Sequence, residues 1–140
     1  MHSNKSKVKV RYAETDKMGV VHHSRYYPWF EVGRGEFITE SGMTYRDIEE
    51  KGVMMPLVES GCKYIEGAKY ADELIIETFI QELNGAKVIF SYNVIRENDN
   101  KLLAKGTTTH VFVNNEFKII NIKKKHPEIW EKINELYDKE

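Results

Sequence analysis

Cysteine, long apolar runs and net charge are all scarce in this sequence. Cys62 is the single cysteine, so an intrachain disulfide is excluded, which is typical of a reducing compartment. No stretch reaches the 18 apolar residues that a membrane-spanning helix needs, and the first residues include no apolar segment typical of a signal peptide. The formal net charge is −1, so no global field attracts nucleic acid or an anionic lipid surface. We therefore expect a cytoplasmic protein with no membrane span and no nucleic-acid partner.

Linker-like segments are scarce too. Three prolines and nine glycines are spread along 140 residues, with no internal repeat and no low-complexity tract. Apolar residues make up 41% and charged residues 31%, a balance typical of a folded chain with a hydrophobic core. We therefore expect residues 1–140 to form one domain.

The first third of the chain predicts a strand followed by a long helix. Residues 7–12 alternate between polar and apolar side chains, as a half-buried strand does. Residues 24–41 predict the helix, because one face has Tyr26, Phe30, Gly33 and Phe37. Glycine disfavours a helix by about 1 kcal/mol relative to alanine. The cost of Gly33 on the apolar face can be compensated if another element, such as a sheet wrapped around the helix, packs very close to it.

The remainder of the chain mostly has the two-residue period of strands. Residues 74–83 and 86–96 are rich in strand formers and flank Asn84-Gly85, which predicts a hairpin with a type I′ turn. The second of these strands should bury one face, formed by Val88, Phe90, Tyr92 and Val94. Residues 58–64 alternate as well, and residues 101–113 include three consecutive threonines, which favour a strand. A closing helix is expected to begin at Pro127. Consecutive antiparallel strands with one early helix indicate an α+β fold of two layers.

One stretch holds the candidate catalytic residues. Residues 16–26 read Asp-Lys-Met-Gly-Val-Val-His-His-Ser-Arg-Tyr. This stretch resembles the D-x-x-G-V-V-x-H-x-x-Y motif of the 4-hydroxybenzoyl-CoA-type acyl-CoA thioesterases of the hotdog superfamily. A weaker likeness continues through residues 64–74 and 106–113. The resemblance implies a hotdog fold, a curved antiparallel sheet wrapped around one long central helix, here with a short C-terminal helix added. That architecture agrees with the element order deduced above.

The resemblance also implies an enzyme that hydrolyses an acyl-CoA or acyl-carrier-protein thioester to a free acid and a thiol. It places the catalytic carboxylate at Asp16, as nucleophile or general base, and directs the backbone N–H of His23 toward the thioester carbonyl. The chemistry suits this stretch, because a thiol with a pKa of about 8.5 leaves readily. A helix N-terminus also offers unpaired N–H groups to an oxyanion. Gly19 allows the chain to turn back, so that acid and helix start converge. No cofactor and no metal are implied.

The same resemblance assigns the substrate pocket. Tyr26 would shape the acyl pocket, and Val20 and Val21 would line it. His22 stands where an aromatic residue is common in the family, which would alter the pocket or bring a titrating group near Asp16. Pro28 departs from an ideal helix start. Either the helix begins nearer residue 27, or it begins at 24 and loses one hydrogen bond.

Glu59 and the assembly are linked in the resemblance. Glu59 belongs to the first long strand after the helix, where related folds place an active-site acid; an ordinary exposed glutamate is the alternative. Hotdog relatives join sheets edge to edge, which implies a homodimer or homotetramer with sites shared between chains. The strands expected at 53–66 and 101–113 would supply the free edges. Asp16 of one chain would then face residues 58–62 of the other.

Other interpretations remain open. Asp16 could simply close an Asx-turn. His22 and His23 could bind zinc together with Asp16 and a folded-in His110, although no metal motif is present and adjacent histidines rarely point the same way. The chain could also be a non-catalytic acyl-CoA-binding module. A hotdog hydratase or dehydratase is a further alternative, but the His-Phe-Pro-type motif of those enzymes is absent.

Overall fold

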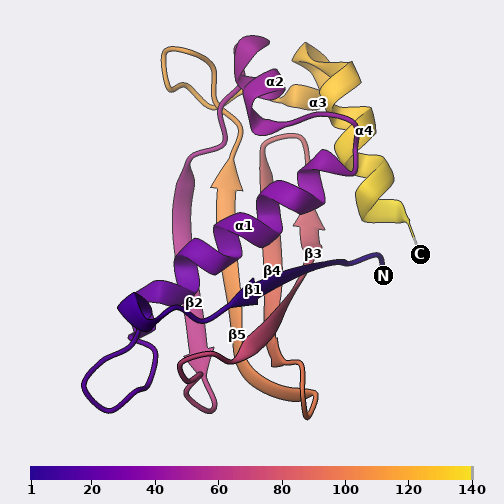
Figure 1. Ribbon diagram of the computed structural model, residues 1–140. Helices are drawn as coiled ribbons and strands as arrows, with labels where there is room; N and C mark the ends of the chain where they lie inside the picture. The colour runs from indigo at the N-terminus through magenta and orange to yellow at the C-terminus, as the bar shows by residue number, and fades with distance from the viewer. Residues whose placement is uncertain (140) are drawn as a thin grey trace.

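A five-stranded antiparallel sheet forms the framework of the computed structural model, which describes residues 1–139 (Figure 1). The sheet order is β1-β3-β4-β5-β2, so β1 and β2 are the edge strands. The strands are β1 Asn4–Lys9, β2 Leu57–Tyr64, β3 Glu73–Leu83, β4 Lys87–Arg96 and β5 Lys101–Val111. Strand β1 begins and ends about three residues earlier than residues 7–12 had predicted. Strand β5 is an interior strand, so the expectation that 101–113 offers a free edge was wrong.

Helix α1, Tyr26–Thr39, crosses one face of this sheet (Figure 1). Its predicted apolar face is confirmed: Tyr26, Phe30 and Phe37 are at most 2% exposed. Gly33 contacts the sheet as the sequence suggested. A Cβ at this position would clash with the Thr78 hydroxyl and lie 3.0 Å from Ile76 Cγ2. The absence of a side chain therefore lets the helix approach β3.

The hairpin between β3 and β4 is present, but its predicted turn is wrong. The type I′ turn needs positive φ at both central residues, and neither Asn84 nor Gly85 has it. Instead, Asn84 Oδ1 accepts hydrogen bonds from the backbone N–H groups of Ala86 and Lys87. Gly85 is needed for space, because the Asn121 side chain lies where its Cβ would be. The Gly85 carbonyl also accepts from the Ile122 N–H at 2.9 Å.

Three further helices cover the end of the sheet furthest from the start of α1 (Figure 1). They are α2 Tyr45–Glu50, α3 Ile122–Lys125 and α4 Pro127–Asp138. Helix α4 was predicted, and its Ile129 and Ile133 are fully buried. Helices α2 and α3 were not. Within residues 1–139, no helix is long and apolar enough to cross a membrane.

Strand β2 is poorly covered on both faces. All of its residues are exposed except Cys62, which is half-buried, although the sequence alternates as a half-buried strand does. Val58 is the extra residue where the pairing with β5 shifts between Leu57 and Glu59. The chain thus presents one long, accessible sheet edge that includes large apolar side chains.

Candidate active site

Residues 15–22, between the 3₁₀ turns Tyr12–Glu14 and His23–Arg25, form a loop that turns back on itself at one end of the molecule (Figure 1). The Asp16 N–H donates to the Val20 carbonyl at 2.8 Å, and Thr15 pairs with Val21 as an isolated β-bridge. Gly19 makes the reversal possible with φ of +77°, and its N–H donates to the Asp16 carbonyl at 3.0 Å. Gly19 therefore allows the chain to turn back, as expected from the sequence.

Asp16 is exposed on this loop. Its Oδ1 accepts from the Met18 N–H at 2.8 Å and from the Val20 N–H at 3.2 Å. The Asx-turn considered as the plain alternative is therefore present. It uses one carboxylate oxygen, whereas Oδ2 accepts no hydrogen bond from residues 1–139. The loop thus orients the carboxylate and leaves one of its oxygens available for chemistry.

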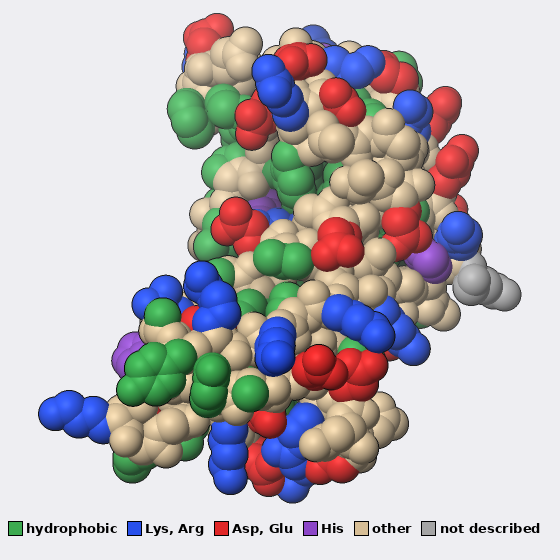
Figure 2. Space-filling model, in the orientation of Figure 1, with side chains coloured by type: hydrophobic (Ala, Val, Ile, Leu, Met, Phe, Trp, Pro, Cys, Tyr) green, Lys and Arg blue, Asp and Glu red, His purple; other side chains and the backbone are tan. Residues whose placement is uncertain are grey.

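Apolar side chains surround this loop at the surface. Tyr12, Met18 and Tyr70 are 76%, 82% and 58% exposed, and the rings of Tyr12 and Tyr70 meet edge to face at 5.6 Å. Figure 2 shows hydrophobic side chains gathered among basic ones at this end of the molecule. Exposed apolar groups that cluster in this way are typical of surfaces that bind a ligand or another chain.

The chain enters α1 through a 3₁₀ turn at His23–Arg25. His22 caps this turn, because its Nδ1 accepts from the Ser24 N–H at 3.2 Å. The backbone N–H of His23 makes no hydrogen bond with residues 1–139. Pro28 is the third residue of α1, where a backbone N–H would lack an intrahelical partner anyway. The first of the two expected arrangements is therefore present: α1 begins at Tyr26, near residue 27, and Pro28 removes no hydrogen bond of α1. The His23 N–H belongs to the 3₁₀ turn that precedes α1, three residues before the α-helix begins.

The three residues expected to line the acyl pocket lie at the base of the loop. Val21 and Tyr26 are buried within the chain, and Val20 packs against Gly67, where a Cβ would lie 2.5 Å from its Cγ1. The Tyr26 hydroxyl accepts from the Ala68 N–H at 3.2 Å, and the Val21 N–H donates to the Ala68 carbonyl at 2.9 Å. Burial raises the pKa of Tyr26, so its hydroxyl stays neutral.

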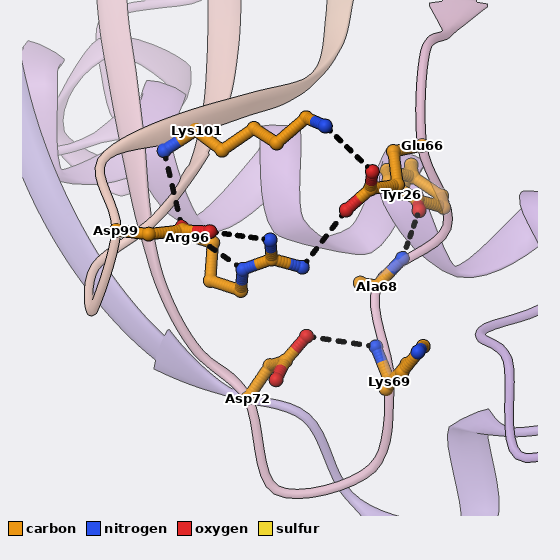
Figure 3. Close-up of polar contacts among 8 residues, drawn as sticks. All are labelled: Tyr26, Glu66, Ala68, Lys69, Asp72, Arg96, Asp99 and Lys101. Atoms are coloured by element: carbon orange, nitrogen blue, oxygen red, sulfur yellow. Dashed lines mark hydrogen bonds and ion pairs between the residues drawn. The ribbon is translucent and has the colours of Figure 1, made fainter.

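The connection between β2 and β3 contacts the loop, because Val20 pairs with Lys69 as an isolated β-bridge. A cluster of ion pairs holds this connection in place (Figure 3). Glu66 pairs with Arg96 at 3.0 Å and with Lys101 at 2.7 Å. Arg96 also binds Asp99 through its Nε at 3.0 Å. These contacts attach residues 65–72 to the ends of β4 and β5, and thereby hold the segment that contacts Val20, Val21 and Tyr26.

Tyr64 was not singled out from the sequence, although it lies within a segment similar to the family. Its hydroxyl donates to the His23 carbonyl at 3.2 Å, and its ring lies 5.1 Å from that of Tyr26. Partial burial raises the pKa of Tyr64, which keeps the hydroxyl protonated and able to donate. The end of β2 therefore meets the start of α1 through this tyrosine.

Within one chain, the fold does not place Glu59 next to the other candidate site residues. It is exposed on β2, five residues before Tyr64, which corresponds to roughly 16 Å along a strand. No hydrogen bond or ion pair among residues 1–139 connects it with Asp16 or His23. A shared site would need a second chain to supply it.

The structure brings together only part of the set of residues that was considered for zinc binding. The rings of His22 and His23 lie 4.1 Å apart, so the expectation that adjacent histidines diverge was wrong here. His110 is elsewhere, buried on β5, with Nδ1 at 3.0 Å from the Met55 carbonyl and Nε2 at 2.9 Å from Thr108 Oγ1. Among residues 1–139, no three His, Cys, Asp or Glu side chains are grouped as metal ligands.

Comparison with known proteins identifies the family. The model of the thioesterase-like superfamily matches residues 10–134. A Bacillus subtilis (strain 168) protein named "Putative acyl-CoA thioesterase YneP" is 38% identical over 129 residues, which cover 91% of this chain and 93% of that one. The acyl-CoA thioesterase YbgC of Haemophilus influenzae is 33% identical over 101 residues, 71% of this chain and 73% of its own.

A solved structure agrees. The DHNA-CoA thioesterase of Staphylococcus aureus superposes with a TM-score of 0.90 at 28% identity, covering 96% of this chain and 91% of that one. The chain belongs to the thioesterase-like superfamily, and the hotdog fold expected from residues 16–26 is confirmed.

Proposed function

We propose that this protein hydrolyses acyl-CoA thioesters, with Asp16 as nucleophile or general base and the His23 backbone N–H as oxyanion donor. Family membership and the acyl-CoA thioesterases among its relatives support the reaction class. One observation supports the assignment of residues. A single loop connects an exposed carboxylate to the turn that leads into α1, and one oxygen of the carboxylate and the His23 N–H have no hydrogen-bond partner among residues 1–139. Acyl-carrier-protein thioesters are the alternative substrate, and no cofactor is needed.

The reaction needs two groups at the carbonyl. As general base, Asp16 would take a proton from water while the water oxygen bonds to the thioester carbon. As nucleophile, it would bond to that carbon itself and form an anhydride that water then cleaves. In both routes the carbonyl oxygen becomes an oxyanion, to which the His23 N–H donates. The C–S bond then breaks, and CoA leaves as a thiolate with little need for an acid, since a thiol such as that of cysteine has a pKa of only about 8.5.

The first prediction is that Asp16→Asn lowers kcat by at least about 100-fold on a panel of acyl-CoA substrates. Asparagine retains the Oδ1 acceptor that holds Met18 and Val20, so the loop and the circular dichroism spectrum should be unchanged. Thiol release measured with a chromogenic disulfide would give the rate. The matched control is Asp47→Asn, which makes the same chemical change at a carboxylate that caps α2. Equal rates for wild type and Asp16→Asn would reject the catalytic assignment.

The second prediction is that hydrolysis needs no metal ion. The thioester is reactive enough for a carboxylate and an oriented N–H. Extended dialysis against a chelator should therefore leave kcat unchanged. Loss of activity that one equivalent of zinc restores would instead assign the adjacent His22 and His23 rings to metal binding.

A further inference from the structure

Glu14 is a buried carboxylate two residues before Asp16, and it is only 4% exposed. Its Oε1 accepts from the Arg11 N–H at 2.8 Å, with the Arg11 guanidinium Nε at 3.6 Å. Its Oε2 accepts from the indole N–H of Trp29 at 3.1 Å. A buried carboxylate is costly unless partners of this kind compensate. The placement of Glu14 therefore calls for a structural or catalytic reason.

Glu14 also joins the two ends of the candidate catalytic loop. Its backbone carbonyl accepts from the His22 N–H at 3.1 Å, next to the bridge between Thr15 and Val21. The same residue thus contacts the end that leads to Asp16 and the end that leads to His23. Through Trp29 its side chain reaches α1 itself, one turn after the helix begins.

We propose that Glu14 is a positioning residue that sets the Asp16 carboxylate relative to the His23 N–H by fixing the loop to α1 through Trp29. The proposal rests on the proposed function. Glu14 itself does not touch the thioester, because it is buried and both of its oxygens are engaged. It matters because the carboxylate lies on the loop while the oxyanion donor lies at the helix start. A displacement of about 1 Å between such groups lowers rates up to about 100-fold.

The test is a double-mutant cycle of Glu14→Gln and Trp29→Phe. The amide keeps one oxygen and loses one acceptor, whereas phenylalanine removes the indole N–H but retains a ring beside Tyr26. We expect each variant to lower kcat about ten-fold, with KM changed by less than about two-fold. The double variant should be no slower than the slower single variant, because the neutral amide weakens and phenylalanine removes the same Glu14–Trp29 contact. Trp130→Phe on α4 is the matched control and should leave kcat unchanged.

A second readout does not depend on turnover. Hydrogen exchange of the amides in residues 15–23 should accelerate in Glu14→Gln and in Trp29→Phe, while exchange in β3 and β4 stays as in the wild type. A purely structural role would lower the melting temperature and accelerate exchange throughout, with kcat per folded molecule unchanged, and that result would overturn the proposal. Additive effects of the two substitutions on kcat would also overturn it.

Failure of the proposed function is distinguishable from failure of this inference. Wild-type protein that releases no thiol from any acyl-CoA would reject the function and leave the exchange experiment to decide on Glu14. Unchanged loop exchange in both variants would then reject the positioning role on its own.

Discussion

His110 is a histidine held neutral in the core. It is 2% exposed, and both ring nitrogens have partners, the Met55 carbonyl and the Thr108 hydroxyl. Thr108 in turn contacts the Tyr92 hydroxyl at 2.6 Å, which accepts from Arg34 at 3.1 Å. Burial lowers the pKa of His110 from 6.5 to about 4, and the Arg34 charge adds to the effect. Protonation of this ring therefore opposes folding.

The third prediction follows from that pKa. The folded state resists the proton and the unfolded state takes it up near pH 6.5. His110 therefore contributes fully above about pH 6.5, and its contribution decreases as the pH falls toward 4. The total loss is about 3 kcal/mol. Urea unfolding at pH 7 and pH 4.5 would measure most of this loss, with His110→Gln as the comparison. The variant should lose less stability between the two pH values, and an equal loss in both proteins would contradict the prediction.

For single residues, the sequence indicates candidate functional side chains by their type and spacing, but it does not show which residues they contact in the fold. Asp16, Gly19 and His23 were recognisable because they lie within one short motif. Glu14 and Tyr64 were not, because their roles depend on contacts made in the fold. Glu14 contacts Trp29, and Tyr64 contacts the carbonyl of His23, 41 residues before it. Only the folded chain brings those pairs together.

Among the elements, α1 owes its position to the places where it and the sheet lack side chains. Gly33 admits Thr78 and Ile76 of β3, and Gly106 of β5 admits the Phe30 ring, whose Cε2 lies 2.5 Å from where a Cβ would be. The helix and the sheet thus each have one glycine, and the space left by its missing side chain is filled by atoms of the other. The helix cannot shift along the sheet without losing both fits.

The fourth prediction compares two glycines of α1. Gly33→Ala should destabilise the protein by about 1–3 kcal/mol despite the better helix propensity of alanine, because the new Cβ overpacks the contact with β3. Gly35→Ala is the matched control. Apart from the helix's own backbone and the adjoining residues, no atom of residues 1–139 lies within 4 Å of a Cβ there, so alanine should stabilise by up to about 1 kcal/mol. Urea unfolding measures both changes. If Gly33→Ala proved as stable as Gly35→Ala, the close contact between Gly33 and β3 would not limit the stability of the protein.

Helices and strands were predicted correctly where the sequence pattern reflects which face of the element is buried. The inward residues of β4 alternate because the sheet has a buried face there, and α1 has one apolar face for the same reason. The type I′ turn was wrong: Asn84 Oδ1 instead accepts from the backbone N–H groups of Ala86 and Lys87, and Asn121, remote in sequence, lies against Gly85. Helix α2 is only six residues long, although its Thr44–Asp47 capping box was a usable signal.

For the whole molecule, β2 is the incomplete part. Leu57, Val58, Tyr64 and the adjoining Ile65 are 43–57% exposed along this edge. Its backbone pairs with β5 on one side only. Apolar strands that have a free edge readily pair with another chain. Glu59 lies on this edge, and the exposed edge supports the predicted homodimer or homotetramer.

The fifth prediction is that light scattering gives a mass of two or four chains. Val58→Lys should shift the mass toward one chain and lower activity, because it places a charge on the pairing edge. Ile119→Lys is the matched control, at an apolar residue that is 64% exposed outside the strands, and should change neither. A stable, fully active monomer would contradict the shared site.

The two edges of the sheet are unlike, and this would limit how far the sheet can extend by pairing with further copies. Strand β1 presents Lys5, Lys7 and Lys9 at the opposite edge from β2, and a lysine-rich edge discourages further strand pairing. A sheet that could add copies at both edges would grow into an open filament. With one receptive edge, two chains that meet through β2 satisfy each other by two-fold symmetry, and growth of the sheet ends there.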